Sequence, residues 1–318
     1  MYVCLSGCMD ARMYVRKYVC MYVRMYVCTY VCMCMYVCVC MLATTSLPNR
    51  HFLLPWKENN CWWTSGLHLL AHIPNILDHC KTLENWKTPL SKCLAQVIFA
   101  VGNNKQCEYE KLWELTREFK GKNTRGTQHA TPDFLEYLIN TCSDVLVPAL
   151  VEIQEIKICN ECQFPYENIR LDPFLRLHFP QTLRYSFSLK ELIDYNFDVK
   201  LEAVNCTVCR KKTKQVRRST INEDFLIVEL MRGNQGLKVN RASINFDANK
   251  ILFPRSSSTY QVIATAHHSG VVSSGHWKVK LQTSSGWICM DSKIASTTPP
   301  GSRHDDGSLS LLILKKNN

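Results

Sequence analysis

The chain has 318 residues, enough for one large domain or two ordinary ones with a proper core. Its formal net charge of +11 suggests an acidic partner, but the basic residues are scattered and only Arg210–Arg218 forms a cluster. We interpret that cluster first as a solvated edge and second as a site for an acidic partner. We therefore expect a monomer that engages neither nucleic acid nor a membrane.

The 18 cysteines fall into two groups. Ten lie in the body of the chain and eight in the first 41 residues, at Cys4, Cys8, Cys20, Cys28, Cys32, Cys34, Cys38 and Cys40. Those ten do not suggest a dense disulfide framework. A reducing compartment is the simpler assumption, so we expect an intracellular protein of the cytoplasm, the nucleus or both.

Residues 1–41 are a low-complexity repeat in which Met-Tyr-Val-Cys or Met-Tyr-Val-Arg recurs. The nucleotide repeat ATGT, read in triplets, encodes Met-Tyr-Val-Cys. Our hypothesis is a translated microsatellite or a mispredicted start, unstructured or spurious. The uncharged run Met25–Asn49 is long enough to mimic a membrane span, but its composition fits β-aggregation at least as well. The segment lacks a signal-peptide layout, and we exclude it from the fold.

From residue 42 to 148 the apolar spacing predicts helices. One follows the capping residues Asn59 and Asn60 and begins at Cys61. Two more cover Pro89–Val101 and Glu108–Lys120. A fourth helix begins near Thr131, with the threonine as its cap and proline at its first position.

After Ala149 the pattern changes to strands separated by Gly, Ser and Asn. The expected strands are Leu150–Cys159, Leu175–Leu183, Thr207–Ser219, Phe225–Met231, Tyr260–His267, His276–Gln282, Trp287–Asp291 and Leu309–Lys315. A helical first half followed by a stranded second half indicates the α+β class.

Cys61 is a candidate nucleophile. The N–H groups and the dipole at a helix N-terminus lower the pKa of a cysteine there, which favours a thiolate at neutral pH. The alternative is a buried cysteine that acts as a small hydrophobic residue. Leu67, Leu70 and Ile73 continue the helix as an apolar stripe that should face a core.

Two Cys-x-x-Cys pairs, Cys159/Cys162 and Cys206/Cys209, are separated by 43 residues. Each pair places two thiolates on one side of a tight turn, and two such turns complete a tetrahedral site for one zinc ion. The alternatives are unrelated reduced pairs or a redox pair. No histidine or open ligand position is indicated, so we predict a structural zinc rather than a catalytic one.

A thiolate nucleophile needs a general base and a group that orients it. His276 stands at the start of an expected strand, and Asp291 follows fifteen residues later at the end of the next one. Antiparallel neighbours with a short connection bring such residues together. We therefore expect Asp291 beside the His276 ring.

From about Pro48 to Lys316 the chain resembles the ubiquitin-specific proteases, of the papain-like cysteine peptidase clan. The stretch around Cys61 is similar to that family's cysteine box, and Tyr260–Gly270 followed by Gly275-His276-Trp277 is similar to its histidine box. Trp287–Asp291 resembles the acid-bearing segment. The two Cys-x-x-Cys pairs match the zinc ribbon of the family's fingers.

The resemblance implies a helical thumb (42–148), zinc-ribbon fingers (149–223) and a β-sheet palm (224–318). It further implies a deubiquitinase. Ubiquitin, free or on a conjugated protein, would lie against the fingers with its tail in the cleft between thumb and palm. Cys61 would attack the carbonyl of the last glycine, His276 would act as base and then acid, and Asp291 would orient His276.

Two positions depart from the family pattern. Trp56 stands where the family has an oxyanion-donating asparagine, and we expect Asn59 or Asn60 to substitute together with the backbone N–H of Cys61; losing such a donor costs about 10²–10³ in rate. Gln128, Ala130, Asp133 and Phe134 occupy the segment that meets the ubiquitin tail, and Ala130 cannot pair with the arginines of that tail.

Three other functions stay open. Trp56-Lys57 and Cys61-Trp62 also resemble a SUMO-cleaving relative of the same fold, so a SUMO isopeptidase is an alternative. Trp56 and Ala130 suggest a second one, a catalytically weak pseudoenzyme that binds ubiquitin or SUMO. The third, a nucleic-acid-binding zinc ribbon, is supported only by the charge and the Arg210–Arg218 cluster.

Overall fold

The structure is a computed structural model that describes residues 54–317 except 56–58, 83–85, 118, 120–128, 183, 198–200, 221–222, 235–237, 255, 272–273, 292–293 and 299–306. The repeat at residues 1–41, Trp56 and Gln128 therefore lie outside the described residues. No helix in the described part is long and apolar enough to cross a bilayer. All ten cysteines of the described part are free thiols.

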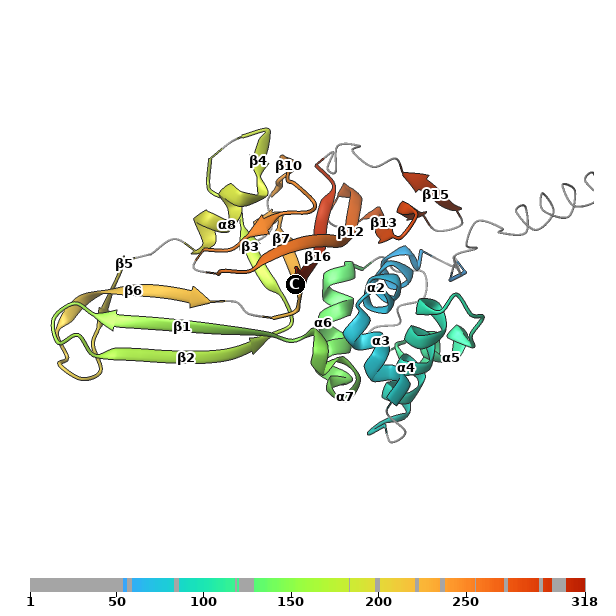
Figure 1. The fold of residues 1–318 in the computed structure, drawn as a ribbon, viewed down its shortest axis with the longest axis horizontal. Coiled ribbons are helices and arrows are strands. Elements are labelled where there is room, and N and C mark those ends of the chain that lie inside the picture. The colour runs from blue at the N-terminus through green and yellow to red at the C-terminus, as the bar shows by residue number, and fades with distance from the viewer. Residues whose placement is uncertain are drawn as a thin grey trace, which may run out of the picture. The chain divides into compact units, whose positions relative to one another are not determined.

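Helices make up the N-terminal part of the described chain (Figure 1). They are α2 (Cys61–Ala71), α3 (Pro74–Thr82), α4 (Pro89–Gly102), α5 (Tyr109–Leu115), α6 (Thr131–Thr141) and α7 (Ser143–Leu146), followed by a 3₁₀ turn at Val147–Ala149. The helices expected to begin at Cys61, Pro89 and Thr131 are confirmed. The expected helix at Glu108–Lys120 is shorter and ends at Leu115, and α3 was not predicted.

The helix starts use two kinds of contact. At α4, Thr88 accepts a hydrogen bond from the backbone N–H of Ser91 (3.0 Å) and proline takes the first position, as such a start requires. At α6, the expected threonine cap is wrong. Thr131 is the first helical residue, and its hydroxyl donates to the carbonyl of Trp62 (3.1 Å). The Thr131 hydroxyl thus forms a buried hydrogen bond to α2, which stabilises the fold more than a capping hydrogen bond exposed to water would.

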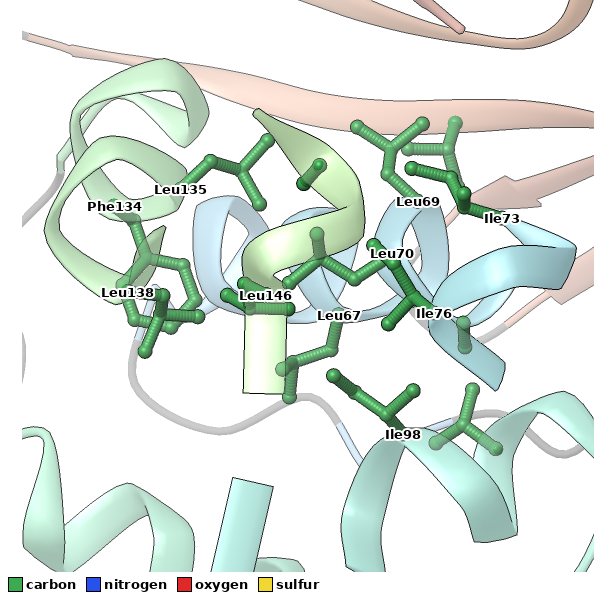
Figure 2. Close-up of a cluster of buried hydrophobic side chains, with 14 of the residues drawn as sticks. Leu67, Leu69, Leu70, Ile73, Ile76, Ile98, Phe134, Leu135, Leu138 and Leu146 are labelled. Atoms are coloured by element: carbon green, nitrogen blue, oxygen red, sulfur yellow. The ribbon is translucent and has the colours of Figure 1, made fainter. Parts of the chain in front are cut away.

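Helix α2 lies at the centre of the helical core. Every residue of it is buried, so the expected one-sided stripe was too narrow. Figure 2 shows Leu67 directed toward Ile98 of α4 while Leu69 is directed toward the strands. A Cβ added to Gly66 would lie 3.0 Å from the Phe134 ring, so glycine lets α6 approach α2 closely.

The larger sheet has the strand order β15-β14-β13-β12-β16-β7-β3, antiparallel except for the parallel pair β3–β7. Its strands are β3 (Leu175–His178), β7 (Phe225–Met231), β11 (Ile251–Leu252, paired with β12), β12 (Thr259–Val271), β13 (Ser274–Thr283), β14 (Gly286–Asp291), β15 (Ile294–Thr298) and β16 (Leu309–Lys316).

Each face of this sheet packs on a different core. Ala266, Val279 and Leu311 face the helical core, whereas Val262 and Leu312 pack with helix α8 (Leu189–Phe197). Alternate residues of one strand serve the two cores, as the two-residue period of a strand requires. The short strands β4 (Ser186–Ser188) and β10 (Ser243–Asn245) pair beside α8, and β8 (Gly233–Asn234) pairs with β9 (Lys238–Val239).

The smaller sheet is fully antiparallel, with the order β2-β1-β6-β5. Its strands are β1 (Val151–Cys159), β2 (Pro165–Asp172), β5 (Leu201–Asn205) and β6 (Lys212–Thr220). Val151 and Ile153 at one end are buried, but Ile169 and Leu171 on the edge strand are 55% and 61% exposed. The described part of this sheet therefore has little core of its own.

The expected strands are present, two of them clearly shortened at one end and most others with slightly different bounds. Phe225–Met231 agrees to the residue, while the strand expected at Leu175–Leu183 ends at His178. The one expected at Thr207–Ser219 begins at Lys212 because the preceding residues form a turn. Among the elements not predicted from the sequence are β2, β5 and α8. The boundaries of thumb, fingers and palm stay a prediction.

Candidate active site and metal centre

Cys61 is the first residue of α2, and α2 packs against β13, the strand that carries His276. Its side chain is buried, with 3% exposed. The backbone N–H of Trp277 interacts with the Cys61 sulfur, as do the N–H groups of Trp62 and of Cys61 itself. Because Trp277 follows His276 directly, the thiol lies at the His276 end of β13.

Burial raises the pKa of the Cys61 thiol, and the negative charge of Asp291 acts in the same direction. The N–H groups of Trp277, Trp62 and Cys61 oppose this rise without overcoming it. The expectation that the helix N-terminus alone yields a thiolate is therefore wrong: removing the sulfur from water costs the charged form more than the N–H groups return. A neighbouring base is needed to take the proton.

His276 and Asp291 form the expected contact. Nε2 of His276 lies 2.5 Å from Oδ1 of Asp291. In the β13–β14 pairing, Val279 stands opposite Met290, which brings the start of β13 beside the end of β14. Both side chains are a little over two-fifths exposed, so water reaches the pair. A carboxylate on one ring nitrogen fixes the orientation of the imidazole.

Asn60 and Asn59 precede the thiol at the start of α2. Asn60 occupies the N-cap position but makes no capping hydrogen bond; its side-chain amide donates to the carbonyl of Pro55 (3.1 Å). Asn60 is 3% exposed, and Asn59 has a left-handed backbone with φ of 64°. One N–H of the Asn60 amide therefore ties the start of α2 to Pro55.

Cys159, Cys162, Cys206 and Cys209 come together at one end of the smaller sheet, and their sulfur atoms all lie within 4.8 Å of one another. The sulfurs of Cys159 and Cys209 are 3.9 Å apart, and those of Cys162 and Cys206 are 3.6 Å apart. In a tetrahedral site with zinc–sulfur bonds of about 2.3 Å, sulfurs are separated by about 3.8 Å. The four ligands therefore fit one tetrahedral metal ion.

The two turns that carry these cysteines have the same hydrogen bonds. The carbonyl of Cys159 accepts from the N–H of Gln163 (2.9 Å), and that of Cys206 accepts from Arg210 (2.9 Å). Gln163 and Arg210 occupy the equivalent left-handed position, with φ of 57° and 55°. This repetition explains why two sequence-distant pairs present their sulfurs in the same way.

Backbone N–H groups in both turns stabilise thiolate. The N–H of Cys162 is the largest cause that lowers the pKa of Cys159, to about 6, and the N–H of Cys209 is the largest that lowers the pKa of Cys206. Each turn thus supplies one readily ionised sulfur, whereas burial and the neighbouring sulfurs of the cluster raise the pKa of Cys162 to about 11. Since metal binding requires thiolates, this supports a cation site.

Beside Trp277 is a cavity of about 400 Å³. Helix α6 and the residue before it contribute Ala130 and Pro132 to the lining, and the end of β7 and its continuation contribute Glu229 and Arg232. Of these four residues, Ala130 was predicted from the sequence to lie near the substrate, whereas Pro132, Glu229 and Arg232 were not. The remaining lining residues are His129, Leu230, Met231, Gly233, Arg241, His268, Ser269, Gly270, Gly307, Ser308 and Ser310.

His268 also lines this cavity and was not identified from the sequence. Its ring stacks on that of Trp277, with centroids 4.7 Å apart. Burial lowers the pKa of His268, and the nearby charges of His276 and Arg241 add to the effect. The adjacent pair His267-His268 was a signal in the sequence, but which of the two faces the cavity depends on the strand register.

Comparisons with known proteins identify the fold. No family model matches the sequence, and no curated protein does either. Solved structures do match. The SAGA DUB module of Ubp8, Sgf11, Sus1 and Sgf73 bound to monoubiquitin aligns with a TM-score of 0.70 and 17% identity over 86% of this chain and 71% of the matched chain. The same module bound to ubiquitin aldehyde gives a TM-score of 0.68 at 17% identity, over 86% and 71% of the two chains.

A third structure, of the yeast SAGA DUB module with a mutated Sgf73, gives a TM-score of 0.66 at 17% identity over 85% and 70% of the two chains. The matched chain is the catalytic domain of Ubp8, so the thumb-like helices, the large sheet and the four-cysteine cluster are parts of a known architecture. At this identity the match concerns the fold. The chain has the α+β fold of a ubiquitin-specific protease catalytic domain.

Proposed function

We propose that this chain is a cysteine-type deubiquitinase that hydrolyses the peptide or isopeptide bond at the C-terminal glycine of ubiquitin. Cys61 is the nucleophile, His276 the general base and then acid, and Asp291 the group that orients His276. The observation that carries the proposal is the 2.5 Å contact between Asp291 on β14 and His276 on β13, the strand against which α2 packs.

The raised pKa of the Cys61 thiol determines how the first step proceeds. With Asp291 on Nε2 of His276, the other ring nitrogen takes the thiol proton as the sulfur attacks the glycine carbonyl. The imidazolium, held by Asp291, then gives that proton to the departing amine and leaves a thioester on Cys61. Water, deprotonated by His276, attacks the thioester and releases ubiquitin with a free carboxylate.

The oxyanion of the tetrahedral intermediate needs donors near Cys61. The backbone N–H of Cys61 at the start of α2 is one, favoured by the helix dipole. We assign the second to Asn60, the residue directly before Cys61, whose side-chain amide is buried. Its burial fixes the amide in one position, which suits a preorganised donor.

The four-cysteine cluster is proposed to hold one structural zinc ion in fingers that support ubiquitin. The sulfur separations and lowered pKa values support zinc, and the thin core of this sheet explains why a metal is needed. The thumb (42–148), fingers (149–223) and palm (224–318) would surround ubiquitin, with its tail in the cavity lined by Ala130 and Trp277.

An electrophilic ubiquitin probe tests the proposal. It should form an adduct on Cys61, Cys61→Ala should abolish the adduct, and His276→Ala should slow it by at least 10² at neutral pH. Asp291→Ala should be milder, because water can partly replace an orienting group. Mass spectrometry locates the adduct. Cys289, half-buried on β14, is the rival thiol, and an adduct there would refute the assignment.

Two alternatives are outcomes of the same experiment. Reaction with a SUMO probe and not with the ubiquitin probe would indicate a SUMO isopeptidase of the same fold. Binding of either modifier by a folded protein that forms no adduct would indicate a pseudoenzyme. Ala130, which lines the cavity without a carboxylate, is the feature that favours testing both.

A further inference from the structure

The cavity near Trp277 is lined in part by two segments that are distant in the sequence. One is the start of α6 with the residues before it, at His129, Ala130 and Pro132. The other is the end of β7 with its continuation, at residues 229–233. A shift of α6 relative to β7 would therefore change the shape of the cavity.

One arginine on a third element contacts both elements. Arg176, on the edge strand β3, places Nη2 3.0 Å from Oε2 of Glu136 on α6. Its Nε lies 2.9 Å from Oε2 of Glu229 on β7, a residue of the cavity lining. The guanidinium also lies over the ring of Phe174, 5.5 Å from its centroid. A planar group with several fixed donors can hold two carboxylates in one geometry, which an ammonium cannot do equally well.

The rest of α6 is tied mainly to α2. At its first turn Thr131 bonds to Trp62, and Phe134 packs on Gly66. These contacts fix α6 relative to the helical core. The ion pair between Arg176 and Glu136 connects α6 to the larger sheet. Glu136 lies one helical turn after Pro132, which lines the cavity.

We propose that Arg176 is a positioning residue that holds α6 at a fixed distance from β7 and so sets the affinity of the cavity for the tail of the modifier. This rests on the proposed function, in which that tail occupies the cavity. Arg176 does not reach the reacting atoms, so its removal should weaken substrate binding and leave the chemical step intact.

The charges around Glu229 favour a cation at position 176. Glu229 is largely buried, and burial raises its pKa, with Glu136 and Asp133 adding to the rise and Arg176 opposing it. The guanidinium of Arg176 thus pairs with two carboxylates, those of Glu229 and Glu136, and Asp133 adds negative charge near Glu229. Without the Arg176 guanidinium, the largely buried Glu229 loses its ion-pair partner. The ion pair that holds Glu136 of α6 beside β3 is lost as well.

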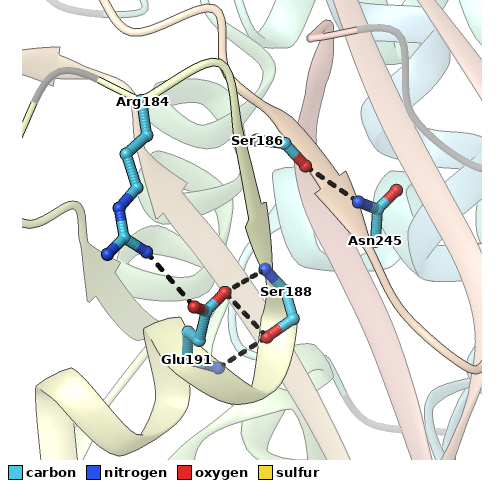
Figure 3. A network of polar contacts seen from close by, with 5 residues as sticks. All are labelled: Arg184, Ser186, Ser188, Glu191 and Asn245. Carbon is cyan, nitrogen blue, oxygen red and sulfur yellow. Dashed lines mark hydrogen bonds and ion pairs between the residues drawn. The ribbon is translucent and has the colours of Figure 1, made fainter.

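Three variants separate positioning from simple stability. Glu136→Gln removes only the ion pair to α6 and leaves the buried Glu229 paired with Arg176, so the fold should be nearly unaffected. Arg176→Lys keeps the positive charge, and Arg176→Gln removes both ion pairs. Arg184→Gln is the matched control. Arg184 also pairs with a glutamate, Glu191, at 3.2 Å (Figure 3). It lies 5.7 Å from the ring centroid of Phe187 and does not line the cavity near Trp277.

Steady-state hydrolysis of a fluorogenic ubiquitin amide gives KM and kcat for each variant. We expect KM to rise about fivefold in Glu136→Gln and tenfold or more in Arg176→Gln, with kcat within about twofold and Arg176→Lys between the two. Arg184→Gln should match the wild type. An unchanged KM in Glu136→Gln and Arg176→Gln, or a loss confined to kcat, would overturn the proposal.

Hydrogen exchange tests the same point without activity. Amides of α6 in Glu136→Gln should exchange about tenfold faster than in the wild type, equivalent to about 1.4 kcal/mol, while those of α4 should not change. If the wild type reacts with no ubiquitin probe, the proposed function fails and exchange alone decides on Arg176. Unchanged exchange in α6 would then refute the positioning role.

Discussion

Removing one cysteine ligand, by Cys206→Ser, should unfold the smaller sheet and leave the helical core folded. The sulfur pairs at 3.6 and 3.9 Å already match the separation of about 3.8 Å in a zinc site, so metal binding needs little rearrangement. Structural zinc sites contribute about 10–16 kcal/mol at pH 7, which is as large as the stability of a whole domain.

The smaller sheet has little else to oppose unfolding. Ile169 and Leu171, on its edge strand, are more than half exposed, whereas every residue of α2 is buried. Hydrogen exchange with mass spectrometry should therefore show loss of protection in β1, β2, β5 and β6 and continued protection in α2. Metal analysis should give about one zinc per wild-type chain and far less in the variant.

Cys289→Ser is the matched control, since this thiol lies outside the cluster and should leave both zinc content and exchange unchanged. Full protection of the smaller sheet in a metal-free Cys206→Ser protein would refute the reasoning. So would a wild-type protein that is folded and contains no zinc.

Three further predictions concern the active site and the N-terminal repeat. Because burial raises the pKa of the Cys61 thiol, its alkylation by a small electrophile should accelerate with pH beyond about 8.5, followed by mass spectrometry; a flat rate from pH 6 to 9 would contradict the raised pKa. Gly275→Ala should lower turnover at least tenfold and also lower Tm, because a Cβ there would lie 2.2 Å from Nε2 of His268 and 2.6 Å from the carbonyl of Ser269; unaltered kinetics would show that the strand can adjust. Deleting residues 1–41 should leave Tm and hydrolysis unchanged, and a large loss in either would show that the repeat belongs to the fold.

Much of the active-site geometry follows from local patterns. The contact between His276 and Asp291 was predictable because a short antiparallel connection allows few relative positions. The clustering of the four cysteines was predictable because each pair fixes its own turn.

What could not be predicted depends on contacts between distant segments. The direction of the Cys61 pKa shift is set by burial against β13, which outweighs the local helix terminus. Thr131 has the sequence of a cap, but a carbonyl on α2 takes its hydroxyl. Arg176 and its two glutamates come from three separate elements, and nothing in their local sequence relates them.

The complete burial of α2 has a consequence for how substitutions in this protein should be measured. A helix that carries the nucleophile on its first residue and fills the middle of the core offers few positions where a side chain can change without loss of folded protein. In a deep mutational scan, most losses of activity along Trp62–Ala71 should therefore reflect reduced abundance in the cell. When activity is divided by the amount of soluble protein, most variants of this helix should recover activity close to that of the wild type. Variants of Cys61 should stay inactive, because they lack the nucleophile.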